Sequence, residues 1–163
     1  MKLKRILFLF FLVVTMVINC NDSNEVNPKS NIQIGKEGGN QVNPIITIVE
    51  IPMTNVKKAI TFYEKIFSIQ IEEMEMGDSV LGVFPTVSNG PSIVLTKGKD
   101  YQPKSEGVLV YLNAGEDLTP VLNLVEPSGG KILLKKTEIS PEMGYYALFL
   151  DIEGNRIGLH SSK

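Results

Sequence analysis

The sequence predicts an α+β fold made of two β-α-β-β-β modules. Runs rich in β-branched residues predict eight short strands, and two further runs place apolar residues at helical spacing. The order of one strand, one helix and three strands occurs twice, and the helical runs carry Val56 and Leu118 at matching places, 62 residues apart. A repeated order of this kind indicates two copies of one structural unit.

The first module opens with a strand at residues 44–51, which is rich in β-branched residues and is stopped by Pro52. Thr54 and Asn55 are candidate N-caps for a helix over residues 56–67, whose apolar residues form one stripe. Turn signals divide the rest of the module into three strands, at residues 69–76, 79–84 and 92–96.

The second module repeats this order. Its first strand is expected at residues 107–112 and its helix within residues 116–125. Because Pro120 is tolerated only in the first turn of a helix, the helix should begin near Asp117. A Gly-Gly pair at residues 129–130 closes the segment, and three strands follow, at residues 131–134, 145–150 and 156–160.

Residues 1–19 have a different character and are predicted to be a cleavable signal peptide. Three basic residues precede an apolar run over residues 6–18. Thirteen helical residues reach about 20 Å, against roughly 30 Å of hydrocarbon in a bilayer, so the run suits a secretory signal better than a membrane span. The run ends at Cys20, the only cysteine, and Val-Ile-Asn-Cys at residues 17–20 resembles a lipobox. That resemblance implies cleavage before Cys20 and lipidation of its thiol.

An ordinary signal cleaved nearby and an uncleaved anchor are the alternatives. Residues 20–43 comprise Cys20 and a stretch dominated by Asn, Gly, Ser and charged residues, which predicts a disordered tether. We therefore expect a bacterial lipoprotein that is held at a membrane through Cys20, outside the cytoplasm. Its folded domain would occupy residues 44–163.

Without residues 1–19 the chain has 13 basic and 18 acidic residues, a net charge of −5, which argues against nucleic acid as a partner.

Three segments resemble the vicinal oxygen chelate superfamily of glyoxalases, bleomycin resistance proteins and dioxygenases. Residues 50–63 resemble its opening strand, turn and helix ending in Phe-Tyr, and residues 129–132 resemble its Gly-Gly turn. Residues 149–159 resemble its closing hairpin, with Ile152 where proline is usual. The resemblance implies that the two modules form a curled, cup-like mixed sheet with the helices on the outer face. Many members bind a ligand and a divalent metal ion in the cup.

The resemblance places the four metal-ligand positions of the family at Ile46, Val94, Gly107 and Gly158. None of these side chains can donate a lone pair to a metal ion. The chain also contains one histidine, so it cannot supply a site with two histidine ligands. We therefore expect neither a metal ion nor another cofactor.

Strand alternation predicts which side chains point into the cup. Glu50, Tyr111, Arg156 and His160 are the candidates for ligand binding or catalysis, with His160 as a hydrogen-bonding group or general base. Tyr111 would form part of an apolar wall. Simpler roles remain open for the other three candidates. Glu50 would be a solvated carboxylate at the rim, Arg156 would stabilise the last hairpin, and His160 would be a partly exposed residue of the terminal strand.

Two function classes follow from these residues. The first is a binding module that holds a small molecule in a cup without a metal. The second is a glyoxalase-like lyase or isomerase that uses Glu50 and His160, or metal ligands relocated to such residues. A purely structural domain is a third interpretation, and a homodimer is left open as a partner.

Overall fold

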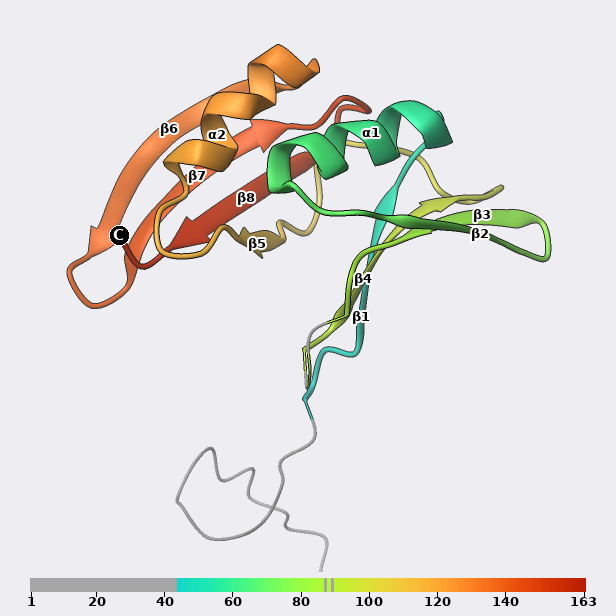
Figure 1. Cartoon of the computed structure of the whole chain (residues 1–163), viewed down its shortest axis with the longest axis horizontal. Helices are drawn as coiled ribbons and strands as arrows, with labels where there is room; N and C mark the ends of the chain where they lie inside the picture. The colour runs from blue at the N-terminus through green and yellow to red at the C-terminus, as the bar shows by residue number, and fades with distance from the viewer. Residues whose placement is uncertain (1–43, 87, 89) are drawn as a thin grey trace, which may run out of the picture. The chain divides into compact units, whose positions relative to one another are not determined.

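The computed structural model describes residues 44–86, 88 and 90–163, and these residues fold into two four-stranded mixed sheets with two α-helices (Figure 1). The predicted signal peptide at residues 1–19 and the predicted tether at residues 20–43, with Cys20, lie outside the described residues. No helix within the described ranges has both the length and the apolar character needed to cross a bilayer.

The first module contains one sheet and one long helix. Its sheet has the strand order β1-β4-β3-β2, in which β1 runs parallel to β4 and the other neighbours are antiparallel. Its elements are β1 (Ile48–Pro52), α1 (Val56–Phe67), β2 (Glu72–Met76), β3 (Ser79–Val83) and β4 (Ser92–Lys97).

The second module repeats this topology with the strand order β5-β8-β7-β6, and β5 runs parallel to β8. Its elements are β5 (Tyr111–Asn113), α2 (Thr119–Val125), a 3-10 helix (Glu126–Ser128), β6 (Lys131–Ser140), β7 (Gly144–Leu150) and β8 (Arg156–Ser161). The prediction of two β-α-β-β-β modules is therefore confirmed. The sheets are curled and not closed, and Figure 1 shows α1 and α2 on the same side of them.

Several element boundaries differ from the prediction for physical reasons. The strand β5 has three residues and begins at Tyr111, four residues later than expected, because only residues 111–113 pair with β8. The helix α2 begins at Thr119, where Asp117 accepts hydrogen bonds from the Thr119 amide (2.9 Å) and hydroxyl (2.7 Å). The hydrogen bond from the Lys136 ammonium at 2.7 Å, together with these two from Thr119, holds the pKa of Asp117 below its usual range. The strand β6 extends to Ser140 because its pairing with β7 continues across three register shifts.

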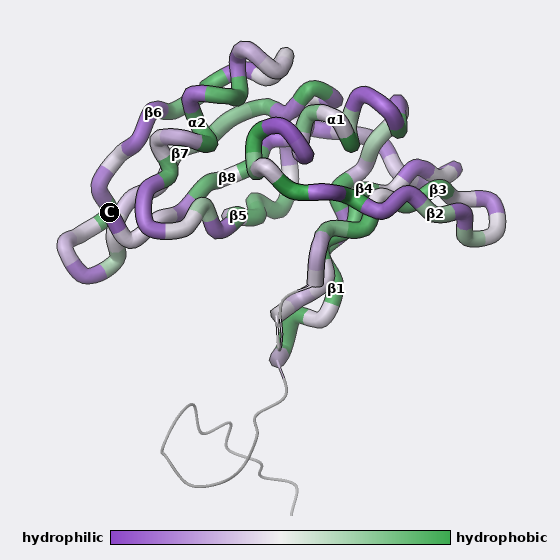
Figure 2. The backbone as a smooth tube through the Cα atoms, in the orientation of Figure 1, coloured by the Kyte–Doolittle hydropathy of each residue, from purple (hydrophilic) through white to green (hydrophobic). Residues whose placement is uncertain are grey.

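The helix α1 has the ends and the buried face that its sequence predicts. Asn55 is the N-cap and accepts a hydrogen bond from the Lys58 amide at 3.1 Å. The apolar stripe packs into a single core that includes Phe149, Leu95 and Leu118. Figure 2 shows both hydrophobic and hydrophilic residues along α1, as expected for a helix with one buried face. The buried residues of α1 are Ala59, Ile60, Phe62, Tyr63 and Ile66.

A buried hydrogen-bond network joins the two modules. The Tyr63 hydroxyl of α1 donates to Asp151 Oδ2 at 2.8 Å, and Asn155 Nδ2 donates to the same oxygen at 2.9 Å and to the Pro52 carbonyl at 2.7 Å. Asp151 Oδ1 accepts from the amides of Glu153 (2.9 Å) and Asn155 (2.8 Å). All four donors that Asp151 needs are thus supplied by two segments that lie far apart in the sequence.

The same turn also caps the first helix. The Glu153 carboxylate accepts from the Thr54 amide at 2.8 Å, from the Asn55 amide at 3.1 Å and from the Thr54 hydroxyl. A carboxylate at a helix N-terminus satisfies free amides and interacts favourably with the helix dipole. Gly154 has φ +93°, a conformation that glycine adopts without strain and that the tight turn requires. The closing turn of the second module therefore fixes the start of α1 in the first.

Replacing Asp151 with asparagine tests this junction. Burial raises the pKa of Asp151 above its ordinary value of 3.8, although the hydrogen bonds from Asn155 and Tyr63 oppose that rise. An asparagine would turn an NH₂ group toward hydrogen-bond donors, so we expect D151N to lose about 2–4 kcal/mol of unfolding free energy. Y63F removes the hydroxyl that donates to Asp151, and we expect it to lose about 1–3 kcal/mol. Urea denaturation measures both.

The pH dependence of the unfolding free energy tests whether the pKa of Asp151 is raised. A carboxyl with a raised pKa binds its proton more tightly in the folded state, so its contribution to stability is greatest at low pH and declines as the pH rises through the folded pKa. The stability gap between wild type and D151N should therefore narrow as the pH rises from about 4 to 7. Carboxyls with lowered pKa, such as Asp117 and Glu142, are common to both proteins and cancel in the comparison. A gap that widens would contradict the raised pKa.

Candidate functional site

The strand β8 provides the centre of the concave face. Its residues alternate, so Ile157, Leu159 and Ser161 are buried on the helix side. The predicted site residues Arg156 and His160 lie on the opposite face, at the two ends of the strand, and Gly158 lies between them. Alternation on β7 places Tyr146 on this same concave face, beside His160 in the antiparallel register.

Tyr111 covers Gly158. The two residues are register partners across the parallel β5–β8 pair. A Cβ atom added to Gly158 would lie 2.3 Å from Tyr111 Cδ1, which no real structure tolerates. The Tyr111 ring also packs edge-on against the Tyr146 ring, with centroids 6.3 Å apart and an interplanar angle of 62°. The absence of a side chain at position 158 therefore creates the seat for an aromatic ring.

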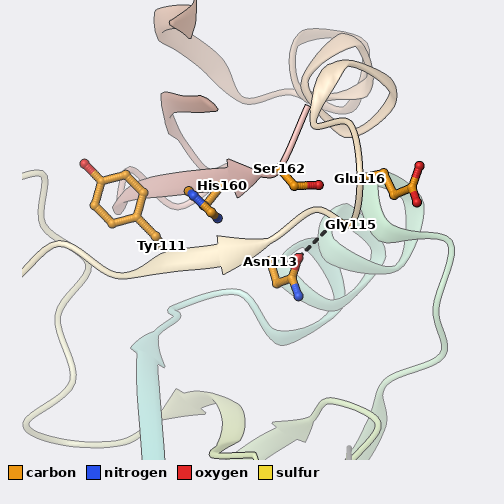
Figure 3. A pocket seen from close by; sticks show the side chains of 6 residues that line it. All are labelled: Tyr111, Asn113, Gly115, Glu116, His160 and Ser162. Atoms are coloured by element: carbon orange, nitrogen blue, oxygen red, sulfur yellow. Dashed lines mark hydrogen bonds between the residues drawn. The ribbon is translucent and has the colours of Figure 1, made fainter. Parts of the chain in front are cut away.

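The orientation of His160 fixes which of its nitrogens can act. His160 Nε2 lies 2.7 Å from the Met143 carbonyl oxygen. Because a carbonyl oxygen only accepts, Nε2 must carry a proton, and Nδ1 is left as the nitrogen that can accept a hydrogen bond or a proton. Figure 3 shows Tyr111 and His160 beside each other on the neighbouring strands β5 and β8.

Tyr111 and His160 are shared by two adjoining open pockets. One has a volume of about 620 Å³, and its remaining lining residues are Asn113, Gly115, Glu116 and Ser162 (Figure 3). The other has a volume of about 700 Å³, and its remaining lining residues are Glu138, Ile139, Met143 and Tyr146. The second pocket combines aromatic, thioether and aliphatic surface with one carboxylate, which suits a ligand with a flat apolar part.

Glu50 and Arg156 line a separate cavity of about 200 Å³. Glu50 Oε1 accepts from the Thr96 hydroxyl at 3.0 Å, and both Glu50 oxygens accept from the Tyr101 hydroxyl at 2.9 Å. The hydrogen bond to Glu50 raises the pKa of Tyr101, because ionising the phenol would break it. No sequence pattern pointed to Tyr101, since it lies in the irregular connection between β4 and β5.

The predicted site residues therefore divide into two groups. Tyr111 and His160 share the larger pockets, and Glu50 and Arg156 share the smaller cavity. Neither the two pockets of Tyr111 and His160 nor the smaller cavity is lined by both Glu50 and His160.

Sequence reasoning also missed an apolar cleft of about 470 Å³ between the ends of α1, β4, β5 and α2. Its apolar lining includes Phe67, Phe84, Ile93, Leu112 and Val121. The pattern of these residues is that of ordinary core positions, so only the arrangement of the elements shows that they leave a gap.

The residues at the expected metal-ligand positions do not fit a metal ion. Ile46 precedes β1 and is 56% exposed, and Gly107 lies in the connection before β5. Val94 is an apolar residue of β4, and the place of a side chain on Gly158 is taken by the Tyr111 ring. Within residues 44–86, 88 and 90–163, no group of three or more His, Cys, Asp or Glu side chains is arranged to hold a metal ion. We derive no metal-dependent step.

Known proteins are similar to this chain in sequence or in fold. A glyoxylase-like domain-containing protein of Didymella fabae is 30% identical over 115 residues, which are 68% of this chain and 88% of that protein. A glyoxalase family protein from Bacillus cereus has a TM-score of 0.56 at 14% identity, over 77% of this chain and 98% of that one. Glyoxalase I from Zea mays has a TM-score of 0.53 at 16% identity, over 71% of this chain and 45% of that one. This chain therefore corresponds to a little under half of the maize enzyme.

Two curled β-α-β-β-β modules define the class as the glyoxalase and bleomycin resistance type of fold. The chain belongs to the glyoxalase-like family of the vicinal oxygen chelate superfamily. No family model matches the sequence. The superfamily expected from the three sequence segments is confirmed.

A double-mutant cycle tests the contact between Tyr111 and Gly158. In G158A the new methyl group must displace the Tyr111 ring, so we expect a loss of about 1–3 kcal/mol of unfolding free energy. In a Tyr111→Ala background the same substitution should cost less, which gives a coupling energy of about 1 kcal/mol or more. Urea denaturation of the four proteins measures it. Additive effects would show that the ring does not lie over Gly158.

Proposed function

We propose that the concave face of the second sheet binds a small molecule with a flat apolar part, without a metal ion. The observation that carries this proposal is the Tyr111 ring seated over Gly158. It places an exposed aromatic surface at the position where the family resemblance expects a metal ligand. A ring in that seat can stack on a ligand, whereas it cannot hold a metal ion in the way a carboxylate would.

Exposure of the surrounding side chains supports binding at this face. Tyr111 is 46% exposed, Ile139 42% and Met143 60%, and Tyr111 and Met143 line the 700 Å³ pocket with Tyr146 and His160. Methionine and tyrosine together give an adaptable apolar surface with few polar groups. His160 Nδ1 and the Glu138 carboxylate supply the polar contacts that would orient a ligand.

The enzymatic alternative has less support from the geometry. A lyase or isomerase that uses Glu50 and His160 needs both groups within reach of one substrate. The two residues line different pockets, and Glu50 is engaged by Thr96 and Tyr101. Binding without chemistry at these two residues is therefore the function that we favour.

A fragment screen with matched variants tests the binding proposal. Purified residues 44–163 would be screened by thermal shift with a set of aromatic fragments. A fragment at 100 times its dissociation constant should raise the unfolding free energy by about 2.7 kcal/mol, which is several degrees for a domain of this size. Tyr111→Ala and His160→Gln should each weaken the hits about tenfold or more.

Tyr101→Phe is the control, because it removes a tyrosine hydroxyl that contacts Glu50 and lines neither pocket of Tyr111 and His160, so it should leave the hits unchanged. Hits that survive in Tyr111→Ala would place the ligand elsewhere, for example in the apolar cleft. Elemental analysis of protein purified without chelators should find well under one equivalent of metal, and EDTA should not lower the melting temperature. A stoichiometric metal would contradict the proposal.

We further propose that the domain is held at a bacterial membrane by lipid on Cys20, outside the cytoplasm. The basic residues, the apolar run and the Val-Ile-Asn-Cys segment support this proposal. Cys20→Ser should move the full-length protein from the membrane fraction to the soluble extracytoplasmic fraction, and should abolish metabolic labelling with a fatty acid. Wild-type protein in the soluble fraction would contradict the anchor.

A further inference from the structure

The cavity of Glu50 and Arg156 lies where the modules meet, at the opposite end of β8 from His160, and it shares no lining residue with the two pockets of Tyr111 and His160. Strand β1 contributes Glu50, the connection before β5 contributes Gln102, Lys104 and Glu106, and the start of β8 contributes Arg156. At about 200 Å³ the cavity holds roughly seven water molecules, or a solute of similar size.

The charges around this cavity are balanced but are not paired with one another. Two acidic and two basic side chains line it, namely Glu50, Glu106, Lys104 and Arg156. The ion pairs formed within the described residues are Lys136–Asp117 and Lys163–Glu116, and neither involves these four. Glu50 is instead bonded to two neutral hydroxyl groups, which leaves its negative charge uncompensated by a cation.

Hydrogen bonds hold two parts of the cavity lining in place, the Glu50 carboxylate and the backbone at Lys104. The Thr96 hydroxyl that orients Glu50 belongs to a residue only 1% exposed. The connection is fixed where the Lys104 amide donates to Asn155 Oδ1 at 3.2 Å, and Asn155 is part of the buried Asp151 network. A carboxylate that is already oriented reduces the ordering cost of binding.

We propose that this cavity binds a small zwitterion of the α-amino acid type, with its ammonium group toward Glu50 and its carboxylate toward Arg156. Balanced charges of both signs favour such a molecule over a simple anion, which the carboxylates of Glu50 and Glu106 would repel. They disfavour a simple cation in the same way, through Lys104 and Arg156.

Titrations with charge-deleted analogues test the proposal. Glycine, L-alanine, L-serine and L-glutamine would be titrated into ¹⁵N-labelled protein, together with their N-acetyl and methyl ester derivatives. At least one amino acid should bind with a dissociation constant below about 10 mM, and both of its derivatives should bind at least about tenfold more weakly. No binding in that range, or equal binding of the derivatives, would overturn the proposal.

Charge-neutral variants assign the two ends of the ligand. Glu50→Gln retains an acceptor for Tyr101 and Thr96, and should weaken amino acid binding about tenfold without weakening N-acetyl amino acid binding. Arg156→Gln should weaken amino acid binding without weakening ester binding. Glu75→Gln on β2 and Lys131→Gln on β6 are matched controls outside the cavity.

Tyr111→Ala should leave amino acid binding intact, so this proposal and the proposed aromatic site can fail independently. A loss of binding in the Glu75 or Lys131 control as large as that in Glu50→Gln or Arg156→Gln would overturn the assignment.

Discussion

The buried carboxylate of Asp151 is the interaction on which the arrangement of the two modules depends. It accepts four hydrogen bonds, one of them from the Tyr63 hydroxyl in the first module. Its neighbour Glu153 satisfies the amides at the start of α1, and Asn155 binds the end of β1 at the Pro52 carbonyl. One five-residue turn therefore sets the position of both ends of the β1–α1 connection. The alternative, an unpaired buried charge, costs several kcal/mol.

The sequence predicted the repeated topology because both modules carry strong local patterns. The apolar stripe of α1 and its Asn55 cap are local signals, and each appears where it was expected. The length of β5 and the extent of β6 depend on which neighbouring strand offers a partner, and a single sequence does not contain that information. Tyr63 shows the same limit, since helical spacing predicts its burial but not its hydrogen bond to a residue 88 positions later.

The candidate site was predictable in its parts but not in its grouping. Alternation on β8 correctly indicates one face for Arg156, Gly158 and His160. The two ends of that face nevertheless belong to different pockets, because Arg156 lines one and His160 lines another. Which residues meet depends on what lies over the strand. Tyr111 covers the middle at Gly158, and the connection with Tyr101 covers the end near Glu50. Neither covering group follows from the periodicity of β8.

The position of the Glu50–Arg156 cavity has a consequence for stability. Glu50 belongs to the first module and Arg156 to the second. Asn155 joins their two segments, because it precedes Arg156 in the chain and donates a hydrogen bond to the Pro52 carbonyl at the end of β1, the strand that carries Glu50. A ligand that bridges the two side chains binds only when the modules are docked, so its binding free energy adds to the stability of the junction. The linkage is reciprocal: a weaker junction lowers the population of the binding-competent state and hence the apparent affinity. The hydrogen-bond network at Asp151 would then influence the affinity of the cavity without contacting the ligand.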